Sequence, residues 1–265
     1  MYLLKINTAG RGMLSGTTPV KGYYRGNVFH TIEVQPLDAL PLSPVELLAL
    51  DICISLYNAG YREFDALDVL GACNGVERVK PSKVSTEQIN EINTVIIHLR
   101  DISIYIDNST APLLDVVANG CKVYHYRDGV GTATNWKFVG PPLLLDNAND
   151  LRGVITYPVE LMKLGCTRGT QSACIKKYLL DRIFTSNAQK GKRYKKRTGA
   201  NIVRLSTIKK VAGCTTRQAT QKTRQRVHNL LDVFATCDAV PLLSYDIIDA
   251  GTPRERYKLV FGNRD

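Results

Sequence analysis

Residues 217–235 restrict the fold of this chain more than any other stretch. Apolar residues recur there at the three- and four-residue spacing of one helical face, and they are Val227, Leu230, Leu231 and Phe234. Amide and basic residues occupy the opposite face, and they are Gln218, Gln221, Lys222 and Gln225. This spacing predicts an amphipathic helix that packs by one face and exposes a polar, basic face.

A shorter helix is expected just before this long one. Ile208, Val211 and Ala212 follow helical spacing, and Gly213 then supplies a flexible break. The hydroxyl of Thr215 can cap the next helix by accepting a backbone hydrogen bond. A short helix, a tight turn and a long helix over residues 201–235 have the layout of a helix-turn-helix.

Positive charge is concentrated around this motif. Residues 182–231 contain fourteen Lys and Arg and no Asp or Glu, whereas the whole chain carries +11, so the remaining residues sum to −3. A local field of this sign attracts nucleic acid or an anionic membrane surface. No run of about 18 apolar residues is present, so we expect no membrane span.

The remaining composition predicts a cytoplasmic protein without disulfides. The start, MYLLKINTAGRG, has no apolar segment of the kind that directs secretion. The seven cysteines are odd in number and widely spaced, which favours reduced, buried thiols over disulfides.

A chain of 265 residues that is 44% hydrophobic is long enough for two domains, and a single large domain is the alternative. In the first part we expect one or two strands and no helix over residues 1–40. Helices are expected over 44–58, 64–75 and 85–101. Ser43, Pro44 and Glu46 mark the start of the first of these, and Ser85 with Gln88 fits a capping box at the start of the third.

Strands are expected after the third helix. The runs 102–107, 121–128 and 136–146 are β-rich, and the Gly-rich segment 127–135 is predicted to be the turn between the last two. Three helices followed by a hairpin are the order of a winged helix-turn-helix. A turn-rich break at 146–150 precedes a strand and a short helix that close this domain, which we assign to residues 1–165.

The second part, residues 170–265, repeats this order. A helix is expected over 172–188, a solvated loop over 190–199, then the helix-turn-helix, and finally a hairpin over 241–262 that turns at 249–253. The sequence therefore predicts an α+β protein with two tandem winged helix-turn-helix domains. No residue-level repeat accompanies this repeated architecture.

Two successive units of this size, the second strongly basic, resemble the plasmid replication initiators of the Rep type. The resemblance rests on STEQINEINTVIIHLRDISIYIDN in the first part and LSTIKKVAGCTTRQATQKTRQRVHNLLDVF in the second. It implies a protein that binds repeated sites in an origin of a plasmid or mobile element and that can also repress its own gene. It further implies that the first domain helps dimerisation or makes an accessory DNA contact, so a homodimer through this domain is an implied partner.

The second helix of a helix-turn-helix places its N-terminal residues against base edges in the major groove. Arg can bond both acceptors of guanine, and Gln can bond both groups of adenine. We therefore predict four base-reading residues: Arg217, Gln218, Gln221 and Gln225. The predicted phosphate contacts are the basic residues of the loop, the two helices and the last hairpin: Lys192, Arg193, Lys195, Lys196, Arg197, Lys209, Lys210, Lys222, Arg224, Arg226, Arg254, Arg256 and Lys258.

The basic helix and the basic loop also have simpler interpretations that involve no DNA contact. A basic amphipathic helix is often only a solvated surface, but such helices usually mix charges of both signs to gain support at four-residue spacing. From Arg217 to Leu231 there are four Lys and Arg residues and His228, and none is acidic. The basic run at 190–199 is weaker evidence, because a flexible loop alone would account for it.

The sequence lacks the residue patterns of a nucleic-acid enzyme. The four histidines never occur as HxH, so the metal pair of a nicking initiator is missing. Cys121 and His125 have no second ligand pair nearby, and residues 129–134 lack the third Gly of a nucleotide-binding loop. We expect no enzyme activity, no metal site and no cofactor.

Three functions remain open on the sequence alone. A replication initiator and a transcription regulator share this fold and this DNA chemistry, and two winged domains in one chain favour the initiator. A relaxase or recombinase is the least favoured, and cleavage of supercoiled DNA with a divalent metal would revive it. Double-stranded DNA is the expected partner in the first two cases.

Overall fold

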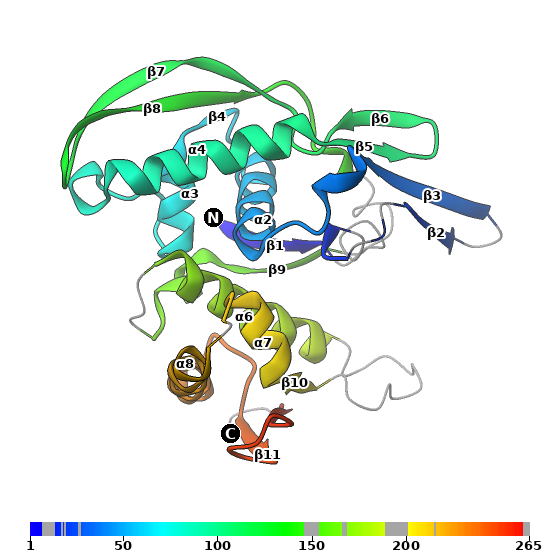
Figure 1. Cartoon of the computed structure of the whole chain (residues 1–265), viewed down its shortest axis with the longest axis vertical. Coiled ribbons are helices and arrows are strands. Elements are labelled where there is room, and N and C mark those ends of the chain that lie inside the picture. Colours follow the sequence, from blue (N-terminus) through cyan, green and yellow to red (C-terminus); the bar gives the residue numbers. More distant parts are fainter. Residues whose placement is uncertain are drawn as a thin grey trace. The chain divides into compact units, whose positions relative to one another are not determined.

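The computed structural model forms two compact units, Met1–Val159 and Glu160–Asp265, both drawn in Figure 1. Each contains helices and antiparallel sheets, so the chain is α+β. The sequence placed the boundary a few residues later, between 165 and 170. The structure describes residues 1–6, 14–16, 18, 20–25, 28–145, 154–165, 169–188, 201–214 and 216–261.

The described residues of unit 1 include three α-helices of eight or more residues, and the starts of the first and third were predicted from their capping residues. They are α2 (Pro44–Asn58), α3 (Ala66–Cys73) and α4 (Thr86–Asp101). Ser43 and Glu46 form a capping box before α2, and Ser85 and Gln88 form one before α4, as predicted. Two short 3-10 helices, η1 (Leu37–Ala39) and η2 (Pro81–Lys83), occur at connections within the described residues of unit 1, and a third, η3 (Val159–Lys163), follows at the boundary to unit 2.

The strands of unit 1 form three antiparallel sheets. The first pairs β1 (Tyr2–Ile6) with β9 (Val154–Pro158). The second has the order β2-β3-β5-β6, from Val20–Arg25, Val28–Gln35, Ser103–Ile106 and Ser109–Pro112. The third has the order β4-β8-β7, from Glu63–Phe64, Gly129–Phe138 and Val116–Tyr126.

Three expectations for unit 1 were wrong. The described residues among the first forty include three strands and the 3-10 helix η1, where one or two strands and no helix were expected. Residues 129–135 belong to strand β8 and are not the turn, which lies at Arg127 and Asp128. Their Gly and Thr content suggested a loop, yet the partner strand β7 and the burial of Ala133 fix them as a strand. The strand expected over 136–146 ends at Phe138, before Gly140 and two prolines, and residues 143–145 are helical.

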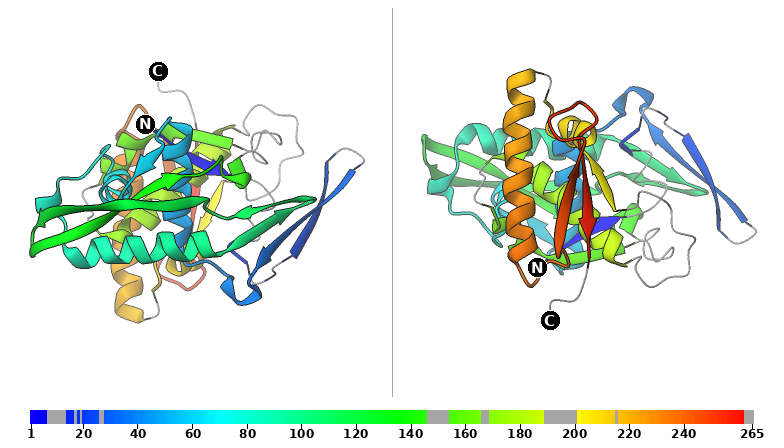
Figure 2. Two further views of the ribbon diagram at one scale, coloured as in Figure 1. Left: turned by 90° about the horizontal axis from the view of Figure 1, so that it is seen from above. Right: turned by 90° about the horizontal axis from the view of Figure 1, so that it is seen from below.

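The core of unit 1 joins the helices to strands β4 and β8. Phe64 and Phe138 pack with ring centroids 4.8 Å apart, and both side chains are buried. The buried Trp136 donates from Nε1 to Asn93 Oδ1 of α4 at 3.3 Å. The long β7–β8 hairpin therefore runs alongside α4, as Figures 1 and 2 both show.

The described residues of unit 2 form three α-helices and a three-stranded sheet. The helices are α6 (Thr170–Ala188), α7 (Leu205–Val211) and α8 (Arg217–Thr236). The sheet has the order β10-β12-β11, from Ile202–Arg204, Arg256–Val260 and Ser244–Ile248. Both the helix-turn-helix spacing and the final hairpin were predicted, and in Figure 2 α8 lies beside that hairpin.

The two units share most of one order of elements. In unit 1 this order is α2, β4, α3, α4, β7 and β8, with strands β5 and β6 inserted between α4 and β7. In unit 2 it is α6, β10, α7, α8, β11 and β12. In both sheets the first short strand pairs with the third, in the orders β4-β8-β7 and β10-β12-β11. The sequence missed β4 and β10, because runs of two and three residues carry no periodicity of their own.

The predicted faces of α8 are confirmed. Val227, Leu230, Leu231 and Phe234 are all at most 1% exposed. On the other face Gln218, Gln221, Lys222 and Gln225 are all exposed. The turn-rich break at 146–150 and the basic loop at 190–199 lie outside the described residues.

Candidate nucleic-acid interface

The turn between α7 and α8 is held by its own backbone. Gly213 has a φ of +62°, and its N–H donates to Lys210 O at 3.1 Å. The next residue, Cys214, donates its N–H to Lys209 O at 2.9 Å. This pair of bonds is a Schellman motif, in which glycine takes the left-handed conformation that ends a helix. The chain can therefore leave α7 sharply and enter α8.

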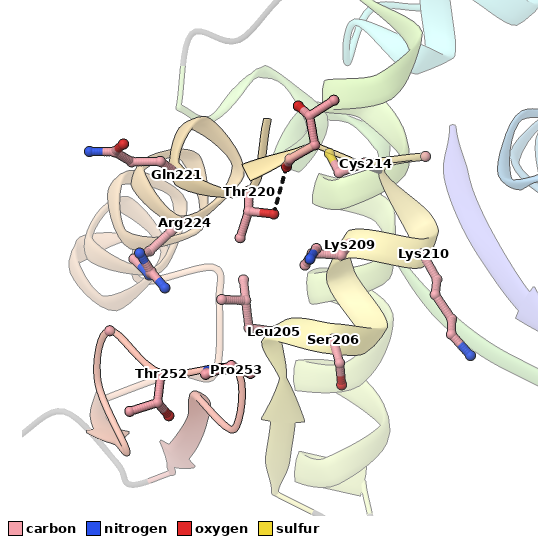
Figure 3. A pocket seen from close by; sticks show the side chains of 13 residues that line it. Leu205, Ser206, Lys209, Lys210, Cys214, Thr220, Gln221, Arg224, Thr252 and Pro253 are labelled. Carbon is pink, nitrogen blue, oxygen red and sulfur yellow. Dashed lines mark hydrogen bonds between the residues drawn. The ribbon is translucent and has the colours of Figure 1, made fainter. Parts of the chain in front are cut away.

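Thr216 caps the start of α8, where the sequence suggested Thr215, which lies outside the described residues. The Thr216 hydroxyl accepts from Ala219 N at 3.1 Å. Its carbonyl accepts from the Thr220 hydroxyl at 2.9 Å, the bond drawn in Figure 3. The N-terminus of a helix carries partial positive charge, so this end of α8 favours an anionic partner.

Gln171 of α6 fixes the other side of the turn. Its side-chain amide nitrogen donates to Ala212 O, and its Oε1 accepts from Arg226 Nη1 at 2.9 Å. The turn is also joined to α8 through Cys214 Sγ, which lies 2.9 Å from Thr223 Oγ1. Side chains of α6 and α8, Gln171 and Thr223, therefore both hold the turn between α7 and α8.

A groove of about 1170 Å³ lies between these helices and the last hairpin. We call it the α8 groove. Its walls come from α7 (Leu205, Ser206, Lys209, Lys210), from α8 (Thr220, Gln221, Arg224) and from the hairpin turn at Gly251–Pro253. Figure 3 shows Gln221 and Arg224 on one side, Lys209 on another and the hairpin turn below them. The groove therefore lies beside the first two turns of the amphipathic helix.

Several predicted DNA-contact residues lie together at this groove, and their side chains have no hydrogen-bond or ion-pair partner among the described residues. Gln221, Lys209 and Lys210 line it, and Gln218 and Lys222 are exposed on the same helix face. Within the described residues none of these five side chains has a hydrogen-bond or ion-pair partner. Arg217 begins α8, but its side chain lies outside the described residues.

Other predicted contacts already have protein partners. Gln225 donates to Asn229 Oδ1 at 3.0 Å, and Arg226 is bound to Gln171. On the hairpin, Arg256 lies 3.4 Å from Asp249 and Lys258 lies 3.9 Å from Asp246. Arg254 is exposed. The loop residues Lys192, Arg193, Lys195, Lys196 and Arg197 lie outside the described residues.

Arg224 is bound to the buried carboxylate of Glu255. Its Nε lies 3.0 Å from Oε1 and 2.9 Å from Oε2, and Glu255 is only 1% exposed. These bonds use Nε, and Arg224 also lines the α8 groove. The carboxylate thereby sets the direction of this side chain.

Glu255 also joins all the elements that form the groove. Its carboxylate accepts from Gly251 N in the hairpin turn at 2.6 Å and from Tyr257 OH of β12 at 2.6 Å. Its backbone carbonyl accepts from Leu205 N, the first residue of α7, at 3.0 Å. With Arg224, this one residue connects α7, α8, the hairpin turn and β12.

The electrostatics of this cluster keep Glu255 ionised. Burial alone raises the pKa of the Glu255 carboxyl, but hydrogen bonds from Tyr257, Gly251 and Arg224 outweigh it and lower the pKa. Burial and the bond to Glu255 raise the pKa of Tyr257, so its hydroxyl stays a donor. A buried carboxylate is tolerated here because charged and polar donors satisfy it.

Glu255 and Gln171 were not among the predicted site residues. The basic block was expected to lack acidic partners, yet the partner of Arg224 comes from 31 residues further on. One signal was available. Burial alternates from Glu255, the residue before β12, along the strand: Glu255, Tyr257 and Leu259 are buried, and Arg256 and Lys258 are less buried. That period of two places Glu255 on the inward face.

Comparison with known proteins gives no family assignment. No protein-family profile matches the chain, and no curated protein matches it. Among solved structures, a crystal structure of selenomethionine derivatives of domains 2 and 3 of RctB aligns over 95% of this chain and 93% of that chain. The sequence identity between the two chains is 11%, and the TM-score is 0.40.

Two further observations concern the described residues only. No helix among them is long and apolar enough to cross a membrane. No group of three or more His, Cys, Asp or Glu residues among them is placed to hold a metal ion, and Cys121 and His125 gain no further ligand there.

Proposed function

We propose that this chain binds double-stranded DNA sequence-specifically through unit 2, and that both units are winged helix-turn-helix domains. The observation that carries the proposal is the α8 groove. It lies beside the start of an amphipathic helix, and unengaged amide and ammonium groups surround it. The shared order of elements and the pairing of the first strand with the third support the domain assignment.

The proposed base readers are Arg217, Gln218 and Gln221, at the start of α8. Each good pairing between a side chain and a base edge contributes about 1–3 kcal/mol of discrimination. Gln225 is one turn further along, and its bond to Asn229 must open or rotate before it reads a base. The exposed ammonium groups of Lys209, Lys210 and Lys222 are suited to phosphates.

Arg224 has a second task in this proposal. Its bond to Glu255 holds the guanidinium in one orientation before DNA arrives, which lowers the entropy lost on binding. We therefore treat Arg224 as a positioning residue that also offers its terminal nitrogens to the groove. The loop residues 192–197 remain proposed phosphate contacts.

We further propose that the protein acts without catalysis, as a replication initiator of a plasmid or mobile element. This rests on the resemblance to Rep-type initiators and on the two tandem units. Such a protein binds repeated origin sites, and a homodimer through unit 1 is part of the same proposal. Direct repeats beside the gene, bound by the purified protein in order of their match to a consensus, would support an initiator over a regulator.

Binding of a fluorescent duplex across a salt series tests the proposal. Neutralising several phosphates releases counterions, so the logarithm of the affinity must fall linearly and steeply with the logarithm of the salt concentration. No duplex binding even at low salt would contradict the proposal. Selection of bound sequences from a random pool then supplies the specific site.

Paired substitutions test the residue roles. Arg217→Ala is expected to weaken the specific site more than random DNA, whereas Lys195→Ala weakens both alike. Equal losses for the two variants on both kinds of DNA would remove the assignment of base reading to Arg217.

A further inference from the structure

A second cavity, of about 410 Å³, lies on unit 2 and shares Ser206 and Pro253 with the α8 groove. We call it the arginine pocket. Its lining includes three arginines from different parts of the unit: Arg204 at the end of β10, Arg254 in the hairpin turn and Arg256 at the start of β12. The hydroxyl-bearing residue Ser206 of α7 lines it too.

Two of these arginines are placed opposite each other by the sheet. Arg204 of β10 and Arg256 of β12 are cross-strand partners. Like charges directly opposite on neighbouring strands destabilise a sheet. The fold therefore maintains an unfavourable pair at this position, and an anion between the two arginines would relieve it.

The acidic groups of the pocket do not balance its positive charge. Asp249 lies 3.4 Å from Arg256 and offsets one arginine. The Glu255 carboxylate already accepts from Arg224, Gly251 and Tyr257. Within the described residues, the exposed guanidinium groups of Arg204 and Arg254 have no acceptor. The pocket is thus left with two uncompensated positive charges.

We propose that the arginine pocket binds one backbone phosphate of the DNA, with Arg204 and Arg254 as the principal ligands. The inference rests on the proposed function, because it supplies a sequence-independent anchor beside the α8 groove. Arginine suits this task, since its planar set of donors matches the oxygens of a phosphate. Arg204 is outside the set of contacts that the sequence suggested.

Asp249 limits the strength of this anchor. It neutralises Arg256 at the edge of the pocket and adds a negative charge near the proposed phosphate. Its φ is +56°, in the left-handed region, which asparagine also tolerates. Asp249→Asn therefore removes the charge while the backbone conformation is kept.

The test measures duplex binding by fluorescence anisotropy in full-length protein over a potassium chloride series. Arg204→Ala is expected to reduce the slope of log affinity against log salt by about 0.9, the loss of one phosphate contact. It should weaken specific and random duplexes by the same factor. Asp249→Asn is expected to bind both duplexes more tightly than the wild type. Lys163→Ala, an exposed charge of unit 2 outside both cavities, serves as the control for net charge.

The outcomes separate the inference from the proposed function. If the wild type binds DNA but Arg204→Ala keeps its slope and affinity, or changes them no more than Lys163→Ala, the arginine pocket is not a phosphate site. Tighter binding by Asp249→Asn cannot come from misfolding, so unchanged or weaker binding by that variant also counts against the inference. If the wild type itself does not bind duplex DNA, the proposed function fails and this inference fails with it.

Discussion

Apart from the inserted strands β5 and β6 of unit 1, units 1 and 2 have the same order of helices and hairpin strands, but the start of the equivalent helix differs between them. In unit 1, Asp128 of the β7–β8 turn accepts from the Thr86 backbone N–H at 2.9 Å and from the Thr86 hydroxyl at 2.8 Å. The hairpin turn therefore occupies the N-terminus of α4. In unit 2 the hairpin turn is instead bound by Glu255, which accepts from the Gly251 N–H. The α8 groove remains open beside the start of α8.

The side-chain charges at the starts of α4 and α8 also differ, and they too favour an anionic partner only at α8. The second residue of α4 is Glu87, whereas the second residue of α8 is Gln218. A carboxylate stabilises a helix N-terminus, but it repels a phosphate. One arrangement of helices and strands can thus serve packing in one unit and recognition in the other, because function belongs to the site and not to the fold.

The largest expected effect comes from adding a carboxylate at matched positions of the two helices. Gln221 and Asn90 are both the fifth residue of their helix, and both are exposed. Gln221→Glu is expected to weaken duplex binding by about 100-fold, because a like charge facing DNA costs several kcal/mol. Asn90→Glu is expected to leave binding unchanged within about twofold, as measured by anisotropy at fixed salt.

Equal losses in these two variants would break the comparison, because unit 1 would then contribute to DNA binding as strongly as unit 2. Thermal unfolding of both variants controls for damage to the helices. Both positions are solvent-exposed, so each substitution should change stability by less than about 0.5 kcal/mol.

A smaller effect is expected from removing the buried ion pair of each unit. Arg78 binds Asp65 and Asp68 in unit 1 at 2.6 Å each, and Arg224 binds Glu255 in unit 2 at 2.9 Å. Arg78→Ala and Arg224→Ala should each lower the free energy of unfolding by about 2–3 kcal/mol, because a buried carboxylate loses its partner. Only Arg224→Ala is expected to weaken DNA binding as well, by about tenfold, since it alone orients a group in the groove.

Urea unfolding and anisotropy on the same samples check this pair. Arg224→Lys restores the charge but not the geometry of the guanidinium, so it should recover stability more than affinity. A loss of DNA affinity in Arg78→Ala equal to that in Arg224→Ala would show that stability, and not positioning, controls binding.

The smallest expected effect is on pH dependence. Burial raises the pKa of Asp68, whereas hydrogen bonds lower the pKa of Glu255 in spite of its burial. A carboxyl with a lowered pKa stabilises the fold above its ordinary pKa, near 4.5 here, and loses that contribution as pH falls through the folded-state pKa. Asp68 has the opposite sign and opposes folding less as pH falls. Glu255→Gln should therefore lose less stability than the wild type between pH 6 and pH 3, measured by urea unfolding. A steeper loss in that variant would reverse the assigned sign.

Local signals in the sequence predicted much of the fold. The starts of α2 and α4 followed from capping residues, and the buried face of α8 followed from its spacing. These features depend on residues within one or two helical turns, where side-chain and backbone chemistry decides the outcome. The first seven residues of strand β8 were predicted as a turn because their Gly and Thr residues are typical of turns when considered alone.

The candidate site was less predictable, because its geometry depends on distant partners. The position of Arg224 is decided by Glu255, and that of Arg226 by Gln171, each more than thirty residues away. The arginine pocket arises only when β10 and β12 pair, so no short window of sequence contains it. The exposed residues of α8 were foreseen, whereas the network that orients them was not.

Hydrogen exchange with and without bound duplex DNA tests the central claim most directly. Amide protection on binding is expected in α7, the first half of α8 and the hairpin turn at 249–256. The equivalent segments of unit 1, α4 and the β7–β8 hairpin, should exchange at unchanged rates. Protection concentrated in α4 and β7–β8, with none in α7 and α8, would contradict the assignment of DNA binding to unit 2.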